Sequence, residues 1–295
     1  MSQYLAFRVL GLLAPIVPPS LAYWLCDRLG DIVYWLLPKR RATVSRNISR
    51  VVRGREVALE PMVRGTFREG TKYYYDTFRA AALSDAQLER LVHFDGLDIL
   101  GNVLEQGRGA IILTAHFGSP SLVVQIIAMR GYKITTVVEP VKPQKLFDLL
   151  NGARGSRGIR LLPLGPSSFQ DLSAALRRNE VVGLLADRDL QGTGVSVKLF
   201  GAETKLPIGP VMLSLRTGAP LLPTFGVRDE NGKFRGYMEE PVPLERTGDL
   251  REDIRVNTQK AAEVLERAIS KRPDQWIVFE PIWPEAGEVK MAPRR

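Results

Sequence analysis

The sequence holds one cysteine and two histidines among 295 residues. One cysteine excludes a disulfide within the chain and any multi-cysteine metal site, and Cys26 lies in an apolar helical run, where a buried, unreactive thiol is expected. The motifs H-E-x-x-H, C-x-x-C and G-x-S-x-G are also absent. Metal-dependent and serine-hydrolase mechanisms therefore have no support, and neither a metal site nor a cofactor is expected.

Acidic residues are the minority, since 41 lysines and arginines face 32 aspartates and glutamates, for a formal charge of +9. An excess of this sign fits an acidic partner, either anionic phospholipid or nucleic acid. The basic residues cluster beside apolar helices and lack the interleaved aromatics of single-strand binders, so nucleic acid is not expected. The cluster consists of Lys39, Arg40, Arg41, Arg46, Arg50, Arg53 and Arg55.

No charged residue occurs between Arg8 and Asp27, but prolines interrupt this stretch. Pro18-Pro19 should end a helix, so we expect two short helices and not one membrane span. Apolar helices, amphipathic aromatics and an arginine face together suit a segment lying in the interface of an anionic bilayer. The alternative is a helical hairpin packed on the core with a solvated basic face.

Short apolar runs alternate with helical patterns from about residue 90 onward. This order predicts an α/β fold with a largely parallel central sheet flanked by helices, preceded by a membrane-associating helical hairpin. The expected division is a helical extension over 1–56 and an α/β domain over 57–295. Asn231-Gly232 predicts a hairpin, and 276–279 is predicted to be a closing strand.

The candidate general base lies in the stretch 109–124. The apolar run 110–113 is followed by His116 and then by Pro120, which predicts a buried strand, a sharp turn and a helix. A histidine at the carboxyl end of such a strand lies at the edge where α/β folds bind ligands, and imidazole is the usual base for a hydroxyl proton. The other histidine, His93, is expected to be structural.

Further polar side chains end neighbouring predicted strands. Asp187, Arg188 and Asp189 follow one apolar run, and Glu139 ends another. Carboxylates can orient an imidazole, and a guanidinium can bind phosphate or an oxyanion. Parallel strands would bring these groups to one crevice with His116; a salt-bridged turn is the alternative for 187–189. Three more arginines are candidates for binding an anionic donor, namely Arg154, Arg157 and Arg160.

Four blocks, in order, carry a family resemblance: GRGAIILTAHFGSPSL, LLADRDLQGTGVSVKLFG, LPIGPVMLSLRTGAPLLPTFGVR and WIVFEPIW. They resemble the bacterial lipid A biosynthesis acyltransferases, and the ADRD block and charge balance are closest to the phosphatidylinositol mannoside acyltransferase branch. The resemblance implies a peripheral or monotopic enzyme on the cytoplasmic face of the inner membrane. Such an enzyme moves a fatty acyl group from acyl-CoA or acyl carrier protein to a hydroxyl of a glycolipid or phospholipid acceptor.

The resemblance also implies a catalytic His-x-x-x-x-Asp or Glu motif, whose histidine falls on His116. The acid position holds Ser121, and a hydroxyl scarcely stabilises a charged imidazole. Either another carboxylate partners His116, with Asp187, Asp189 and Glu139 as candidates, or the chain is a weakened relative that binds lipid or acyl-CoA. In the active case, turn amides near Gly118 and the Arg188 guanidinium are expected to stabilise the oxyanion.

Overall fold

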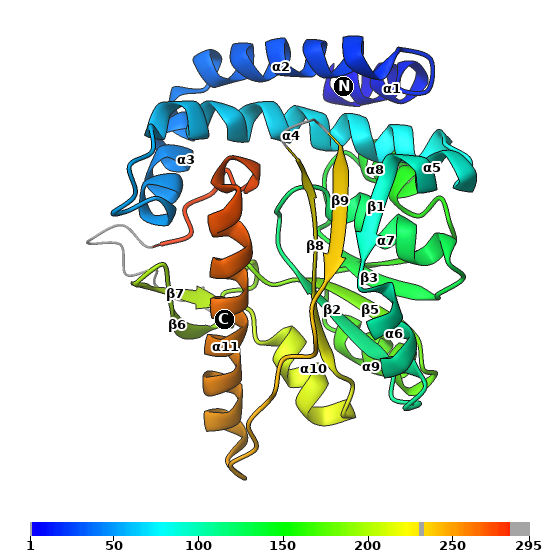
Figure 1. The fold of residues 1–295 in the computed structure, drawn as a ribbon, viewed down its shortest axis with the longest axis vertical. Helices are drawn as coiled ribbons and strands as arrows, with labels where there is room; N and C mark the ends of the chain where they lie inside the picture. The colour runs from blue at the N-terminus through cyan, green and yellow to red at the C-terminus, as the bar shows by residue number, and fades with distance from the viewer. Residues whose placement is uncertain (1, 230–232, 284–295) are drawn as a thin grey trace.

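A seven-stranded sheet in the order β1-β9-β8-β2-β5-β3-β4 forms the centre of the computed structural model, which describes residues 2–229 and 233–283 (Figure 1). Neighbouring strands are parallel except for the antiparallel pair β8 and β9. The predicted, mostly parallel sheet is thereby confirmed; the Asn231-Gly232 turn itself lies outside the described residues. The strands are β1 (Val92–Asp95), β2 (Ala110–Thr114), β3 (Ile134–Val138), β4 (Arg160–Pro163), β5 (Val181–Leu185), β8 (Leu221–Arg228) and β9 (Phe234–Met238).

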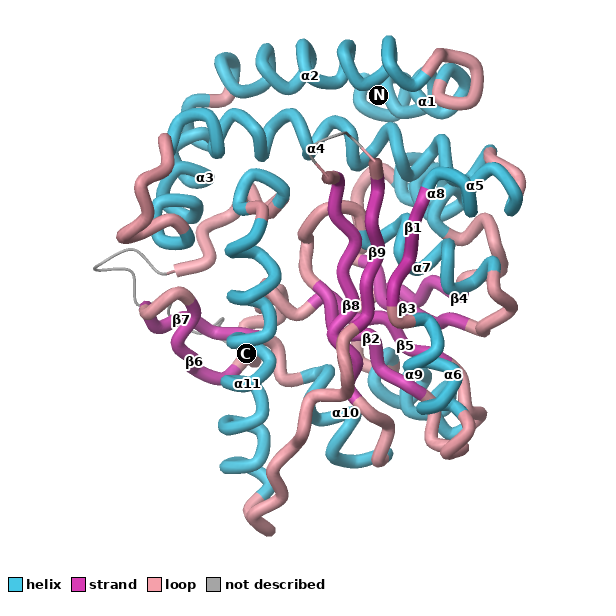
Figure 2. Tube along the Cα trace, viewed as in Figure 1, coloured by secondary structure: helices cyan, strands magenta, loops and turns pink. Residues whose placement is uncertain are grey.

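Helices surround this sheet, as Figure 2 shows. The helices after residue 56 are α4 (Leu59–Ala82), α5 (Asp85–Leu91), α6 (Leu97–Leu104), α7 (Pro120–Met129), α8 (Gln144–Arg154), α9 (Ser168–Arg177), α10 (Gly209–Thr217) and α11 (Leu250–Lys271). Prolines in the first turn of α7 and α10 open these helices at the expected places, because the fixed φ of proline suits a helix start and its missing N–H is not needed there.

Strand β2 is buried on both faces, which explains its unbroken apolar sequence. Ile111 and Leu113 belong to one large core cluster, whereas Ala110 and Ile112 belong to a second cluster on the opposite face. Alternate side chains of a strand point to opposite sides of a sheet, so β2 joins the two cores. The turn that contains His116 therefore begins at the end of a strand whose five residues are all buried.

Two predicted strands lie outside the central sheet. Strand β6 (Val195–Leu199) pairs only with β7 (Ala202–Leu206) in a separate antiparallel hairpin beside α11. The prediction of a closing strand at 276–279 is wrong: after the 3₁₀ helix η1 (Pro273–Gln275), this segment makes one isolated bridge, from Trp276 to Phe117. Because β5 and β8 already occupy both edges of β2, the segment can pair only with the turn that follows it.

Three helices precede α4, namely α1 (Ser2–Leu13), α2 (Pro19–Leu36) and α3 (Pro38–Val51). The break between the first two coincides with Pro18, which caps α2, and so two short helices are present, as predicted. Within residues 2–229 and 233–283, no helix combines the length and apolar character that crossing a bilayer requires. The division of the chain at residue 56 stays a prediction.

Helix α2 has two contrasting faces. Its inner face packs on α4, where Gly30 approaches so closely that an added Cβ would stand 2.6 Å from Arg68 Cα, and Cys26 is buried there as expected. Its outer face lies on the rim of the molecule, above α4 in Figure 1. This face carries large apolar side chains in contact with solvent. They recur at helical spacing as Leu21, Trp24, Leu25, Leu29, Ile32, Trp35 and Leu36.

Candidate active site

The register of the sheet places His116 beside Asp187. Strand β2 pairs with β5 so that Thr114 stands opposite Leu185, and the same offset two residues later aligns the histidine with the aspartate. His116 Nδ1 lies 2.9 Å from Asp187 Oδ1, and the His116 backbone N–H donates to Asp187 Oδ2 at 3.1 Å. Of the three carboxylates that the sequence left open as partners, this is the one that contacts the imidazole.

The Asp187 carboxylate is completely buried, with a side-chain exposure of 0%. Its Oδ2 also accepts a hydrogen bond from Trp276 Nε1 at 2.9 Å. Burial by itself raises the pKa of this carboxyl, but the charge of His116 and the hydrogen bonds from His116 and Trp276 outweigh burial and hold the pKa below its ordinary value. The carboxylate therefore stays ionised and fixes the orientation of the imidazole, whose side chain is 28% exposed.

The turn after His116 is locked by a close contact with β8. Gly118 has φ +62°, and an added Cβ would lie 1.8 Å from the carbonyl oxygen of Gly226, so no other residue fits. The Gly118 N–H donates to the carbonyl of Gln275 at 2.9 Å. The hydrogen of this amide therefore holds the 273–276 segment against the turn, and stabilisation of an oxyanion by turn amides near Gly118 stays a prediction.

A cavity of about 650 Å³ opens beside His116. Most of its wall is apolar, with side chains such as Val137 of β3, Phe169 of α9 and Met212 of α10. The volume and lining are those of a site for a largely apolar small molecule with few polar anchors. Because His116 Nδ1 faces Asp187, Nε2 is the nitrogen left to react with a ligand in this cavity.

The other predicted polar residues lie around the cavity but do not contact the imidazole. Asp189 Oδ2 accepts from the Gly194 backbone N–H at 2.8 Å and stabilises a turn. Glu139 is exposed at the end of β3 and forms no hydrogen bond or ion pair within the described ranges. Arg188, 17% exposed, pairs with Glu280 at 3.3 Å. Ser121, at the position expected for an acid, contacts Tyr73, with 3.3 Å between the two hydroxyl oxygens.

Only one of the three arginines expected to bind an anion lines the cavity, and it is Arg154. Arg157 points elsewhere: it donates to the carbonyls of Ala80 and Leu83, to Gln125 and to Asp85. Its guanidinium is saturated by these contacts, so it ties α4, α5 and α7 together. Arg160 is exposed and pairs with Asp171 at 3.4 Å. Neither Arg157 nor Arg160 therefore lines the cavity beside His116.

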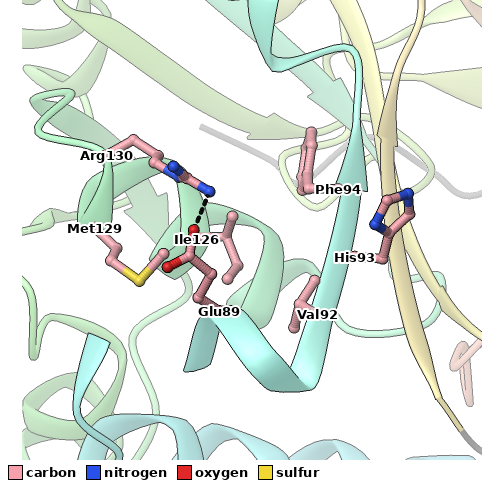
Figure 3. Close-up of a pocket in the computed structure, with 7 residues that line it drawn as sticks. All are labelled: Glu89, Val92, His93, Phe94, Ile126, Met129 and Arg130. Carbon is pink, nitrogen blue, oxygen red and sulfur yellow. Dashed lines mark hydrogen bonds and ion pairs between the residues drawn. The ribbon is translucent and has the colours of Figure 1, made fainter. Parts of the chain in front are cut away.

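His93 belongs to a different hollow, formed by α5, β1 and α7 (Figure 3). Its side chain is 69% exposed, and Nε2 lies 2.9 Å from Asp95 Oδ1. The ion pair between Glu89 and Arg130, at 2.6 Å, crosses the same hollow. No buried partner in the described part of the chain orients the imidazole, so this hollow lacks the buried ion pair present at His116.

Sequence reasoning missed Trp276 and Tyr73. The tryptophan stands in the WIVFEPIW block, and a buried indole N–H requires an acceptor; that requirement was the available signal. Tyr73 lies in a run of three tyrosines, and aromatic residues in such a run are typical of core packing, so the run gave no signal of a cavity-lining hydroxyl. In the part of the chain that the structure describes, no group of three His, Cys, Asp or Glu side chains is placed to hold a metal ion.

Comparison with known proteins extends this picture. The model of the bacterial lipid A biosynthesis acyltransferase family matches residues 2–285. The chain is 32% identical to the phosphatidylinositol mannoside acyltransferase of Mycobacterium tuberculosis, over 81% of this chain and 75% of the relative. Identity is 30% to the enzyme of that name from Mycolicibacterium smegmatis, over 81% and 78%. It is 24% to the lipid A biosynthesis palmitoleoyltransferase of Escherichia coli, over 88% and 84%.

Proposed function

Because the chain belongs to the bacterial lipid A biosynthesis acyltransferase family, we propose that it moves a fatty acyl group from an acyl thioester to a hydroxyl of a glycolipid or phospholipid. The observation that carries this proposal is the His116–Asp187 pair, whose free imidazole edge faces an apolar cavity. The similarity to two phosphatidylinositol mannoside acyltransferases favours an acceptor of that class. The donor is acyl-CoA or acyl carrier protein.

The reaction needs one base and no covalent intermediate. His116 Nε2 removes the proton from the acceptor hydroxyl as the oxygen attacks the thioester carbonyl, and Asp187 stabilises the resulting imidazolium. When the tetrahedral intermediate collapses, the carbon–sulfur bond breaks and the same nitrogen returns the proton to the leaving thiolate. The products are an ester and a free thiol, and the imidazole is neutral again.

The negative charge on the tetrahedral intermediate requires a donor inside the cavity. With the Gly118 amide already engaged, the Arg188 guanidinium is the donor that we assign to this role. Its present partner Glu280 is 45% exposed at the cavity rim. A surface contact of this kind is weak, so an oxyanion can replace the carboxylate.

The acceptor lipid reaches this site from a membrane. Of the seventeen large apolar side chains exposed in the described residues, thirteen precede residue 38, and basic side chains of α3 such as Lys39 and Arg46 follow them at the surface. An apolar face beside positive charge suits peripheral binding to an anionic bilayer. We assign this surface to the cytoplasmic leaflet of the inner membrane, where acyl thioesters are available.

The direct test is acyl transfer by the purified protein from palmitoyl-CoA to phosphatidylinositol-containing lipid extract, with products identified by mass spectrometry. His116→Ala is expected to lower the rate by about a hundredfold to ten-thousandfold, the range for loss of a general base, with an unchanged circular dichroism spectrum. His93→Ala is the matched control and should keep the wild-type rate. Full activity of His116→Ala would refute the assignment.

The alternative is a catalytically silent protein that binds lipid or acyl-CoA, which the serine at position 121 had suggested. The ionised Asp187 beside His116 argues against it. The same assay decides between the two: no product with either donor or with any acceptor fraction, alongside retained vesicle binding, would establish the silent protein.

A further inference from the structure

An arginine guanidinium faces the cavity with no carboxylate to balance it. Arg154 ends α8, and its guanidinium makes one long hydrogen bond, 3.4 Å, to the Tyr73 hydroxyl. Its Nε is buried and has no hydrogen-bond partner. Among residues 2–229 and 233–283, no aspartate or glutamate forms an ion pair with it. A buried cation left in this way is costly unless a bound anion compensates it.

The neighbouring Arg157 makes the contrast clear. Only three residues further on, its guanidinium is satisfied by two carbonyls, an amide and a carboxylate. Arg157, which lies outside the cavity, thus has a full set of hydrogen-bond acceptors from the fold. Arg154, which lines the cavity, has only the Tyr73 hydroxyl among the described residues.

Two hydroxyl groups complete the cluster. The Tyr73 hydroxyl contacts both the Arg154 guanidinium and the Ser121 hydroxyl, and all three residues line the cavity. Ser121 lies in the first turn of α7, whose N-terminus adds a partial positive charge. The cluster thus offers several N–H and O–H donors and no negative charge, an arrangement suited to a tetrahedral oxyanion with several acceptor atoms.

We propose that Arg154, Tyr73 and Ser121 bind a phosphate group of the lipid acceptor and thereby set which hydroxyl reaches His116. This inference rests on the proposed function. Ser121, in the first turn of α7, lies five residues after His116 and lines the same cavity, so a phosphate held here stands near the reacting centre. In coenzyme A the whole pantetheine arm separates the sulfur from the nearest phosphate. A phosphodiester close to the sugar of the acceptor headgroup fits this spacing, and the donor phosphates do not.

Kinetics with each substrate varied in turn distinguish the two sources of phosphate. For Arg154→Gln, the KM for a phosphatidylinositol-based acceptor is expected to rise by about tenfold or more, the loss of a charge-assisted hydrogen bond. The KM for palmitoyl-CoA should change by less than about twofold, by the same reasoning. Arg160→Gln removes an equal charge outside the cavity and should change neither. A rise confined to the palmitoyl-CoA KM, or no rise at all, would overturn the proposal.

A pair of substitutions at one position provides a second arm. Ser121→Glu places a carboxylate beside Arg154 and should raise the acceptor KM as much as Arg154→Gln does, because it neutralises the guanidinium. Ser121→Gln has nearly the same volume and no charge, so its effect should be much smaller. Equal effects of the two would show that size and not charge is responsible, which contradicts the proposal.

Direct binding separates this proposal from the proposed function. Isothermal titration of the wild-type protein with short-chain phosphatidylinositol, and with a short-chain glycolipid that lacks phosphate, needs no turnover. The phosphate-bearing lipid should bind about tenfold or more tightly, and Arg154→Gln should abolish the difference. If the chain proves inactive but shows this preference, the phosphate site stands without the enzyme. If both lipids bind alike to an active enzyme, only the phosphate site falls.

Discussion

At the scale of single residues, the most sensitive group is the buried carboxylate of Asp187. It accepts hydrogen bonds from the His116 ring, the His116 backbone and Trp276, and an amide has only one acceptor oxygen for these donors. Asp187→Asn should lower kcat by about ten-thousandfold, as when the acid of a Ser-His-Asp triad is replaced by its amide. Trp276→Phe, which removes one donor, should cost about tenfold to a hundredfold.

The measurement is kcat at saturating donor and acceptor. Asp189→Asn is the matched control, because it removes a negative charge two residues away, from a side chain that only accepts from Gly194; it should keep most of the wild-type kcat. Wild-type kcat for Asp187→Asn would show that the carboxylate does not orient the base. A larger loss for Trp276→Phe than for Asp187→Asn would be equally contradictory.

The sequence identified His116 and a short set of acids, but it could not choose among them. That choice depends on the β2–β5 register, which a single sequence does not reveal. Once Thr114 stands opposite Leu185, Asp187 is the only one of the three acids that contacts both the backbone N–H and the imidazole ring of His116. The sequence could not separate Arg157 from Arg154 for a similar reason, because the hydrogen bonds of Arg157 go to carbonyls in a distant loop and helix.

At the scale of elements, apolar runs predicted the strands well, since parallel strands buried on both faces leave a clear signal. The order of the strands in the sheet left no signal in the sequence, because β8 and β9 come late in the chain yet lie between β1 and β2. The 276–279 segment shows a second limit. Its apolar residues are buried by the His116 turn and the β6–β7 side of the core. A short apolar run that is buried without strand pairing has the same sequence pattern as a buried strand.

The contact between α2 and α4 depends on the charge of Asp31. This residue accepts from Arg68 and Arg64 at 2.6–2.9 Å, and these hydrogen bonds hold the pKa of its carboxyl well below the ordinary value. A lowered pKa in the folded state adds stability above the unfolded pKa of about 4, and this stability is lost as the pH falls through the folded value. Asp31→Asn should therefore be less stable than wild type at pH 7.

Urea unfolding at pH 7, 5 and 3 checks this dependence. The difference in unfolding free energy between wild type and Asp31→Asn should be constant from pH 7 to about 5 and shrink below about 4. Glu263→Gln, on an exposed side chain of α11, should show no such change. A difference that persists undiminished at pH 3 and below would mean that shape, and not charge, holds α2 in place.

At the scale of the whole molecule, a polar network connects α2 with the active-site turn. Tyr23 donates to Asp76, which also pairs with Arg228 at the end of β8. Gln275 donates to the Arg228 carbonyl at 2.6 Å and accepts from its backbone N–H, and the Gln275 carbonyl receives the Gly118 N–H. Breaking a buried pair of this kind is costly, so this network ties α2 to the catalytic turn.

The exposed face of α2, which we propose to be the membrane-binding surface, is then connected through this network to the active-site turn. Leu29→Glu places a charge in the centre of this face, where the wild-type side chain is 52% exposed and contributes little to the fold. Lost burial in lipid and repulsion from anionic headgroups should together weaken vesicle binding by about tenfold or more. Leu250→Glu makes the identical change at a side chain that is 44% exposed on α11 and should leave binding unchanged. Co-sedimentation with phosphatidylinositol-containing vesicles measures both, and equal binding by the two variants would refute α2 as the membrane-binding surface.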